Sequence, residues 1–202
     1  MPDSYLRLGV LDHRHLDARA VDDPGEAGVT LCERRFMGKI NLRGEPVRPF
    51  RDAVKKALGV APPVKPNTVA TGEACAILWL GPNEWLVTTP PGAEGAALAA
   101  LGEALGKRHV ALVDVSEARA VIGLAGPRAR DVLAKGCALD LHPRAFKAGD
   151  CAQSALAKAG VILHQTDDAP AYDIHVDRSF ADYLWRWLED AAAEYGLAII
   201  RG

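Results

Sequence analysis

The chain has 202 residues, of which 49% are hydrophobic and 25% are charged, and its formal net charge is −2. These values are ordinary for a soluble globular protein, and they argue against a nucleic-acid binder or a protein that works at a membrane surface. No apolar run approaches the roughly 20 residues of a membrane-spanning helix, and the N-terminal stretch lacks a secretory pattern, so we expect a cytoplasmic protein.

Residues 1–27 are polar and charged, and we expect them to form an extended or loosely packed arm. The arm contains His13 and His15, whose spacing could chelate a metal ion. No cysteine or second histidine pair lies nearby to complete such a site, so a solvated arm is the preferred interpretation. The remainder, residues 28–202, is predicted to form two related halves, at about 28–115 and 116–202.

The first half alternates between strands and helices. One of its helices is marked by Pro49 in the first turn and by Gly59 just beyond the last. In chain order we predict a two-strand hairpin, that helix, three strands and a second helix, at residues 29–35, 39–43, 47–58, 68–71, 75–80, 85–88 and 93–105.

A stretch near the middle of the chain has the pattern of a strand, a turn, a second strand and a helix. Residues 110–115 form a short apolar run suited to a buried strand, and residues 118–125 form another. Pro127 suits the first position of a helix because a missing N–H has no consequence there. Gly136 can end that helix in the left-handed conformation. This arrangement predicts the joint between the two halves.

Four residues of this joint are predicted to have structural roles. Asp114 and Ser116 would satisfy backbone donors at the turn between the two strands. Gly126 and Pro127 would open the helix that follows. We therefore assign these residues to the architecture of the chain and give them no catalytic role.

The second half repeats the alternation of the first. After the joint we predict a hairpin turning at Ala159–Gly160, a third strand, a long helix and a short strand, at residues 151–158, 161–165, 171–176, 179–195 and 197–200. Asp167 and Asp168 lie between the hairpin and the third strand. Their Thr and Pro neighbours favour a solvated turn over a paired-carboxylate site.

The long helix of residues 179–195 begins at Ser179, a suitable N-cap, and carries two tryptophans. Trp187 lies on the apolar face, whereas Trp185 is about 200° away around the helix, so one indole must leave that face. An exposed Trp beside other aromatic residues is typical of an interface anchor. Trp185 is therefore a candidate contact to a partner; the alternative is that it covers the sheet edge or packs on the N-terminal arm.

Basic residues are concentrated between residues 34 and 56, where only Glu45 and Asp52 oppose them. A solvated face is the simplest interpretation, since exposed charges are screened over about 8–10 Å at physiological salt. The alternative is a site for an anionic ligand or for the acidic surface of a partner. The candidate interface residues in that case are Arg34, Arg35, Arg48 and Arg51.

The four cysteines lack the spacing of metal ligands, and we interpret them as small buried hydrophobes in a reducing compartment: Cys32, Cys75, Cys137 and Cys151. A reactive thiol at Cys151 is the alternative. The sequence contains no G-x-G-x-x-G turn, no G-x-x-x-x-G-K-[ST] loop and no recognisable nucleophile–base arrangement. We therefore assign no catalytic, cofactor-binding or metal-binding residue to this chain.

Three blocks, residues 78–87, 112–136 and 178–188, resemble in order the gamma subunit of heterotetrameric sarcosine oxidases. The likeness extends from about residue 31 onward. More distantly, the segment from Asp114-x-Ser116 to Gly126-Pro127 resembles the folate-binding fold of the glycine-cleavage T protein. The resemblance implies an α+β fold with two pseudo-repeated ferredoxin-like halves and mainly antiparallel sheets.

The resemblance also implies that the catalytic machinery lies in other chains. In that family the beta subunit carries FAD, FMN sits between alpha and beta, alpha holds NAD and a folate-binding domain, and the small delta subunit holds zinc. The gamma subunit has no assigned reaction. We therefore expect a non-catalytic subunit without a cofactor of its own, with the alpha, beta and delta subunits as partners and with no nucleic acid or membrane bound.

A rival hypothesis is a free-standing, folate-dependent aminomethyl transferase. Relatives of T protein place a carboxylate at the start of the strand that corresponds to about residues 74–80, where it contacts the pterin. Here only Glu73 is available in that neighbourhood. This departure from the pattern weighs against folate binding in this chain.

Overall fold

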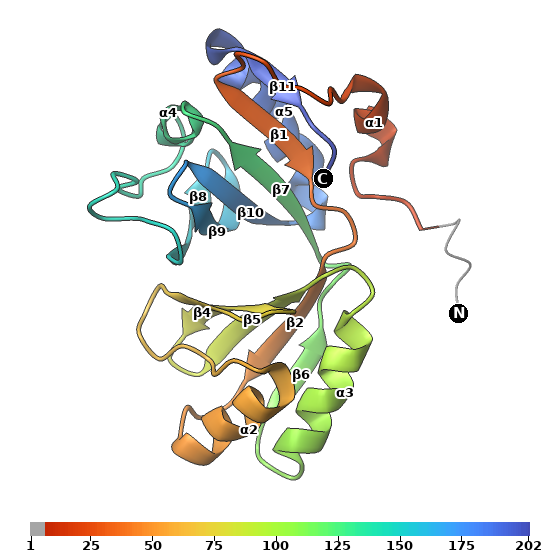
Figure 1. Ribbon diagram of the computed structural model, residues 1–202, viewed down its shortest axis with the longest axis vertical. Coiled ribbons are helices and arrows are strands. Elements are labelled where there is room, and N and C mark those ends of the chain that lie inside the picture. The colour runs from red at the N-terminus through yellow and green to blue at the C-terminus, as the bar shows by residue number, and fades with distance from the viewer. Residues whose placement is uncertain (1–6) are drawn as a thin grey trace. The chain divides into compact units, whose positions relative to one another are not determined.

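The computed structural model describes residues 7–202, which fold into two compact units (Figure 1). Unit 1 comprises the N-terminal residues through 35 together with residues 119–147 and 154–202; unit 2 comprises residues 36–118 and 148–153. Each unit is built on one sheet with helices packed on it, so the predicted α+β class is confirmed. No helix within residues 7–202 combines the length and apolar character needed to cross a membrane.

A six-stranded sheet, which belongs to unit 1 apart from the first residues of β8, has the order β11-β1-β7-β10-β9-β8. Their bounds are Leu197–Ile199, Val29–Glu33, Arg119–Ala125, Ala171–Asp177, Ala159–Asp167 and Cys151–Leu156. β1 pairs in parallel with β11, whereas β1–β7, β7–β10 and β10–β9 are antiparallel, as predicted for most of the fold. The central strands β7 and β10 are buried along nearly their whole length, which explains the apolar and β-branched composition of β7.

The helices of unit 1 are α1 (Leu16–Arg19), α4 (Ala129–Ala134) and α5 (Ala181–Ala192). Short 3-10 turns flank α5 on both sides, so the helical conformation covers the predicted span of residues 179–195 almost completely. α5 packs on β10 and on α4. Its buried side chains fill the core of the unit and are Ala181, Leu184, Trp185, Leu188, Ala191 and Ala192.

The sheet of unit 2 has five strands in the order β3-β4-β5-β2-β6, and two helices pack against it. The strands are Val69–Thr71, Ala76–Gly81, Glu84–Thr89, Gly38–Arg43 and Ala111–Asp114, and the helices are α2 (Arg48–Leu58) and α3 (Glu94–Leu105). α2 ends as predicted at Gly59, whose φ of 78° is left-handed. Phe50 packs on Trp85 with ring centroids 5.4 Å apart, and the Trp85 indole donates a hydrogen bond of 2.8 Å to the carbonyl of Pro63.

The predicted hairpin of residues 29–35 and 39–43 is wrong. β1 pairs with β7 and β11 in unit 1, whereas β2 pairs with β5 and β6 in unit 2. Closeness in sequence favoured a hairpin, but β1 lies between β11 and β7 in the six-stranded sheet, where Val29 and Leu31 are completely buried. The units therefore alternate along the chain instead of dividing it near residue 115. Their relation as repeats of one ferredoxin-like motif stays a prediction.

Residues 12–19 of the N-terminal arm are mostly helical rather than extended, whereas residues 21–26 are exposed and belong to no helix or strand; residues 1–6 lie outside the described residues. A 3-10 turn at Asp12–Arg14 leads into α1, and Leu11 and Leu16 are buried. The backbone N–H of Leu11 also donates a hydrogen bond of 3.0 Å to Glu33 Oε1. The two leucines anchor a segment whose composition is otherwise that of a solvated arm.

Two strand predictions differ from the structure in detail. β6 lies at the edge of its sheet and Val113 is half exposed, so the run at residues 110–115 is not a buried strand. The hairpin of β8 and β9 turns at Ala157–Lys158, two residues earlier than predicted, with Ala157 in the left-handed conformation.

Two helix signals were also misread. Ser179 makes no capping hydrogen bond, and α5 begins after the 3-10 turn. Gly136 does not have the left-handed conformation expected of a helix stop. It is needed instead for close packing, because a Cβ atom there would lie 2.6 Å from Cζ2 of Trp187. Gly136, which follows α4, therefore allows close packing against Trp187 of α5.

Candidate functional site

The turn that follows β6 shows what Asp114 and Ser116 do. Ser116 is buried, and its Oγ accepts a hydrogen bond of 2.9 Å from the backbone N–H of Lys39. The exposed carboxylate of Asp114 accepts the N–H of Ser116 at 2.9 Å, and the N–H of Val115 donates to the carbonyl of Lys39 at 2.8 Å. These bonds connect the end of β6 to the start of β2, which favours the predicted structural role over a catalytic one.

Gly126 stands where β7 gives way to α4 and has a φ of 117°. A Cβ atom at this position would lie 2.6 Å from the carbonyl oxygen of Gly28, so the backbone of β7 approaches its neighbour as only glycine permits. The carbonyl of Gly126 accepts the N–H of Ala129 at 3.0 Å. α4 begins at Ala129, so Pro127 precedes the helix instead of occupying its first position.

The candidate arginines do not form one patch. Arg34 and Arg35 belong to unit 1 and are paired there. Arg34 Nε lies 3.3 Å from Asp173 Oδ1, and Arg35 contacts Glu33 at 3.1 Å and Asp17 at 2.6 Å. Because each carries a carboxylate partner within the chain, neither is a free cation offered to an acidic ligand.

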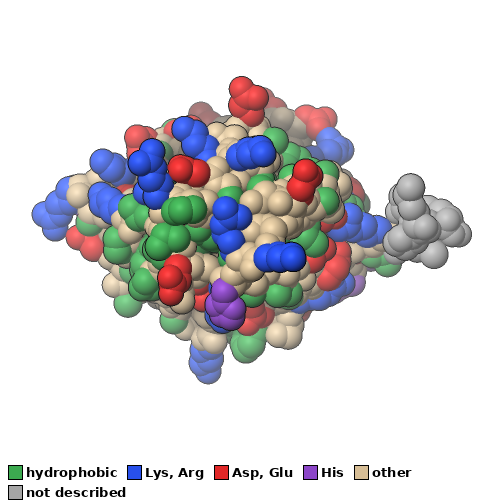
Figure 2. Space-filling view, turned by 90° about the horizontal axis from the view of Figure 1, so that it is seen from below, with side chains coloured by type: hydrophobic (Ala, Val, Ile, Leu, Met, Phe, Trp, Pro, Cys, Tyr) green, Lys and Arg blue, Asp and Glu red, His purple; other side chains and the backbone are tan. Residues whose placement is uncertain are grey.

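Arg48 and Arg51 lie on α2 in unit 2. Arg48 is almost fully exposed and lies 3.6 Å from Asp52 one turn along the helix. Arg51 is half buried, and among the described residues its Nε has no hydrogen-bond partner. Figure 2 shows basic side chains interspersed with acidic and hydrophobic ones on the side of the molecule that carries α2. Mixed charge of this kind is typical of a solvated surface, which favours the simpler of the two interpretations.

A cluster of buried polar groups on one face of the unit 1 sheet was not singled out from the sequence. Three of its members, Cys32, His164 and Asp173, are buried, whereas Arg34 at its edge is exposed. They come together because β1, β7, β10 and β9 are neighbours in register. The alternation of Asp173 and His175 with apolar residues along β10 was the available signal. Both of these side chains are buried.

The electrostatics of this cluster do not create a nucleophile. Burial raises the pKa of the Cys32 thiol, although Arg34 opposes the effect. Burial also lowers the pKa of His164, against the influence of Asp173. At neutral pH the thiol is therefore protonated and the imidazole neutral, and the ion pair of Arg34 with Asp173 offsets the burial of that carboxylate.

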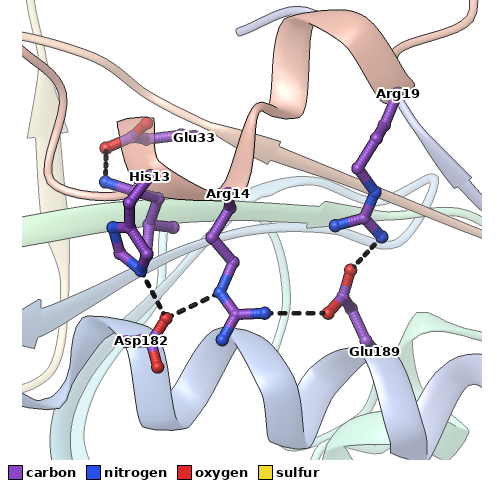
Figure 3. A network of polar contacts seen from close by, with 7 residues as sticks. His13, Arg14, Arg19, Glu33, Asp182 and Glu189 are labelled. Atoms are coloured by element: carbon purple, nitrogen blue, oxygen red, sulfur yellow. Dashed lines mark hydrogen bonds and ion pairs between the residues drawn. The ribbon is translucent and has the colours of Figure 1, made fainter.

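A second polar arrangement joins the N-terminal segment to α5 (Figure 3). His13 Nε2 and Arg14 Nε lie 2.7 Å and 2.6 Å from the same oxygen, Oδ1 of Asp182. Arg14 also lies 3.8 Å from Glu189, to which Arg19 donates a short hydrogen bond. We call this set of three basic and two acidic residues the N-terminal clasp.

The clasp perturbs the groups that compose it. The hydrogen bonds from Arg14 and then from His13 lower the pKa of Asp182 to about 2. The same bond to Asp182 raises the pKa of Arg14, although burial opposes the effect. The side chain of Asp182 is still 45% exposed, so solvent screens the pair strongly. The clasp therefore stabilises the attachment of the N-terminal segment to α5 only modestly, and it favours the ionised form of Asp182.

Trp185 is not the exposed anchor that the sequence suggested, because its side chain is completely buried. Asp182, Trp185 and Glu189 are spaced three and four positions apart and so share one face of α5. The clasp binds both carboxylates, so the face of α5 that carries the indole is also the face to which the arm is ion-paired. Trp187 is only partly buried and packs on Gly136. A partner interface at Trp185 is excluded because no surface of this side chain remains.

The remaining candidates from the sequence are the four cysteines and Glu73. Cys32, Cys75 and Cys151 are buried as predicted, and Cys137 partly so. Burial raises the pKa of Cys151 to about 12, which argues against a reactive thiol. Glu73 is exposed in the turn between β3 and β4. Among residues 7–202, no group of three His, Cys, Asp or Glu side chains is placed to hold a metal ion.

Comparison with known sequences gives matches along most of the chain. Residues 43–194 match the sarcosine oxidase gamma subunit family. Sarcosine oxidase subunit gamma of Corynebacterium sp. (strain P-1) is 38% identical over 182 residues, which are 88% of this chain and 87% of that protein. The subunit of the same name from Corynebacterium sp. (strain U-96) is 34% identical over 196 residues, which are 96% and 94%.

Comparison with solved structures agrees with these sequence matches. A chain of the heterotetrameric sarcosine oxidase from Corynebacterium sp. U-96, in complex with pyrrole 2-carboxylate, superimposes with a TM-score of 0.84 at 35% identity. The match covers 94% of this chain and 96% of that one. The glycine cleavage aminomethyltransferase T from Bartonella henselae gives a TM-score of 0.61 at 16% identity over 96% of this chain and 51% of that one, a likeness of fold alone. Both predicted resemblances are confirmed.

Proposed function

Because the chain belongs to the sarcosine oxidase gamma subunit family, we propose that it is the non-catalytic gamma subunit of a heterotetrameric sarcosine oxidase and serves in sarcosine catabolism. The observation that carries the proposal is the agreement, along nearly the full length of both chains, with a chain of such an enzyme. The aminomethyl transferase alternative rests on a likeness of fold, and the exposed turn position of Glu73 gives it no support.

The proposed role is to support assembly of the flavin-containing subunits. The alpha, beta and delta subunits are the proposed partners, and FAD, FMN, NAD, folate and zinc are proposed to lie in them. Two features support the proposal that the cofactors and the chemistry belong to the other subunits. The sequence lacks a flavin-binding G-x-G-x-x-G turn. The thiol in the buried polar cluster of unit 1 is held in its protonated form, and the carboxylate there is ion-paired.

Co-expression with the alpha, beta and delta subunits of the same organism tests the proposal, with the chain present or omitted. The chain purified alone should be colourless and should not oxidise sarcosine. Omitting it should lower the yield of flavin-loaded complex by about fivefold or more, as loss of a large interface would. Stoichiometric flavin in the isolated chain, or an unchanged yield without it, would overturn the proposal. Micromolar folate binding to the isolated chain would support the transferase instead.

A further inference from the structure

Two large aromatic side chains at the start of α5 lie on the surface of unit 1. Phe180 is 44% exposed and Tyr183 is 37% exposed. Their rings meet edge to face, with centroids 6.3 Å apart and an interplanar angle of 85°. Exposed aromatic residues in contact with one another are unusual on the free surface of a monomer, whereas they are enriched at the centre of protein interfaces.

The pair belongs to a longer stripe. Phe180, the last residue of the 3-10 turn before α5, is followed at spacings of three and four by Tyr183 and Trp187, so the three residues follow one side of this helical segment. We call these three residues the aromatic face. It is distinct from the side that carries Asp182, Trp185 and Glu189, which the N-terminal segment covers. Trp187 is partly buried because its ring packs on Gly136, so the stripe runs from an exposed pair to an anchored indole.

The helix beneath the aromatic face is held rigidly. Leu184, Trp185 and Leu188 are completely buried on its inner sides. The N-terminal clasp adds contacts to Asp182, which lies between the two exposed rings in sequence, and to Glu189. A surface ordered before binding loses little conformational freedom on association, which favours affinity.

The charges around this face point to the chemistry of its partner. The carboxylates of Asp182 and Glu189 are already paired with Arg14 and Arg19. A third acidic residue of α5, Asp190, lies in the field of Lys135 and contributes, after Glu194, to the raised pKa of that amine. Arg186 is exposed and forms no ion pair among the described residues. The helix therefore offers aromatic rings beside an uncompensated cation.

From these observations we infer that the aromatic face of α5 is the surface by which this chain docks on a larger subunit of the sarcosine oxidase complex. The matching surface of that subunit is an apolar pocket that receives Phe180 and Tyr183, with acidic groups on its rim facing Arg186. The inference rests on the proposed function, because only a subunit of a hetero-oligomer has such a partner.

Binding of the purified chain to an alpha–beta–delta assembly prepared without it tests the inference. The double variant Phe180→Ala/Tyr183→Ala should raise Kd about tenfold or more, and Arg186→Glu about fivefold, as expected for residues at the centre and the edge of an interface. The matched controls are Val64→Ala, at a valine of unit 2 that is 52% exposed, and Lys158→Glu, at an exposed turn. Both controls should leave Kd within about twofold.

Footprinting of the unaltered chain provides a second readout that does not depend on how the variants fold. Hydroxyl-radical oxidation of Phe180 and Tyr183 should fall about threefold or more on assembly, since interface residues become desolvated. Unchanged Kd for a double variant that melts like the wild type, or unchanged oxidation, would overturn the docking surface and leave the proposed function standing. Failure of the wild-type chain to bind at all would remove both.

Discussion

The substitution Asp182→Asn tests whether the N-terminal clasp fastens the arm to α5. The carboxylate receives hydrogen bonds from His13 at 2.7 Å and from Arg14 at 2.6 Å, more than 160 residues away in sequence (Figure 3). Asparagine keeps the shape of the side chain and one acceptor oxygen, and removes the charge. The change therefore isolates the electrostatic part of the clasp and leaves the packing of Leu11 and Leu16 intact.

The magnitude follows from the pKa of Asp182, which is lowered from 3.8 to about 2. Taken at face value such a difference corresponds to roughly 2.5 kcal/mol. The side chain is 45% exposed, however, and exposed ion pairs contribute only about 0.2–1 kcal/mol each. With two cationic partners we expect Asp182→Asn to lower the free energy of unfolding by about 1 kcal/mol, or by about 2–4 °C in Tm for a chain of this size.

The pH dependence has a definite sign. The folded-state pKa of Asp182 lies below the value in the unfolded chain, so the carboxylate contributes stability above pH 3.8 that is lost as the pH falls towards 2. Urea unfolding of the two proteins at pH 7, 4, 3 and 2 should show a difference at the higher values that vanishes at the lowest. Asp190→Asn, on the same helix but without a hydrogen-bonded partner in the described residues, is the matched control and should change stability by less than about 0.5 kcal/mol.

A double-mutant cycle with Arg14→Gln measures the coupling directly, and we expect about 0.5–1 kcal/mol between the two sites. Additive effects of the two substitutions, or an equal loss of stability at pH 7 and pH 2, would refute the assignment. In that case the arm would be held by its buried leucines alone.

Three further predictions concern the interior of each unit. Ser116→Ala should lower the free energy of unfolding by about 1–3 kcal/mol in urea titrations, because the buried N–H of Lys39 loses its acceptor. Asp114→Ala should lower it less, since Asp114 is exposed, and an equal loss for the two variants would contradict this ranking. Gly126→Ala should lower stability by about 2–4 kcal/mol, since φ is 117° and the new methyl would meet the carbonyl of Gly28; an unchanged melting temperature would show that the contact relaxes freely. Cys151, with a pKa of about 12, should resist alkylation by iodoacetamide at pH 8 until the chain is unfolded, and rapid labelling of the folded chain would contradict its burial.

Local signals in the sequence predicted most of the elements. Proline in the first turn and glycine after the last placed α2 within one residue at each end, because these residues act through the backbone at their own positions. The strands of unit 2 were located equally well, since each pairs with a strand nearby or carries a clear apolar run. Patterns that depend on a residue's own conformation are thus readable without knowledge of the fold.

The pairing of β1 could not be read in this way. Its neighbours β7 and β11 lie about 95 and 168 residues further along the chain, as in the pairs Thr30–Ala125 and Thr30–Ala198. Hydrophobic alternation shows that a strand has a buried face but does not say which strand lies beside it. The nearest candidate, β2, was chosen by proximity, and it belongs to the other sheet.

The two tryptophans of α5 show the same limit for the candidate interface. Helical spacing established correctly that Trp185 and Trp187 point in different directions, but not which of those directions is covered. Trp185 is completely buried. The arm, whose charged residues look solvated in the sequence, is ion-paired to Asp182 and Glu189 on the neighbouring positions of the helix. The exposed aromatic side chains of this helical segment are instead Phe180 and Tyr183.

The parallel pairing of β1 with β11 also sets an order of events during biosynthesis. A ribosome releases β1 early, but the strand that completes one of its two edges is made about 168 residues later. Unit 2, whose residues 36–118 are continuous, can bury most of its core while synthesis proceeds. Until Leu197–Ile199 emerges, β1 has an open hydrogen-bonding edge, which is a hazard for aggregation. Completion of unit 1 is therefore a late step, and a nascent chain that stalls before β11 leaves this edge for chaperones to cover.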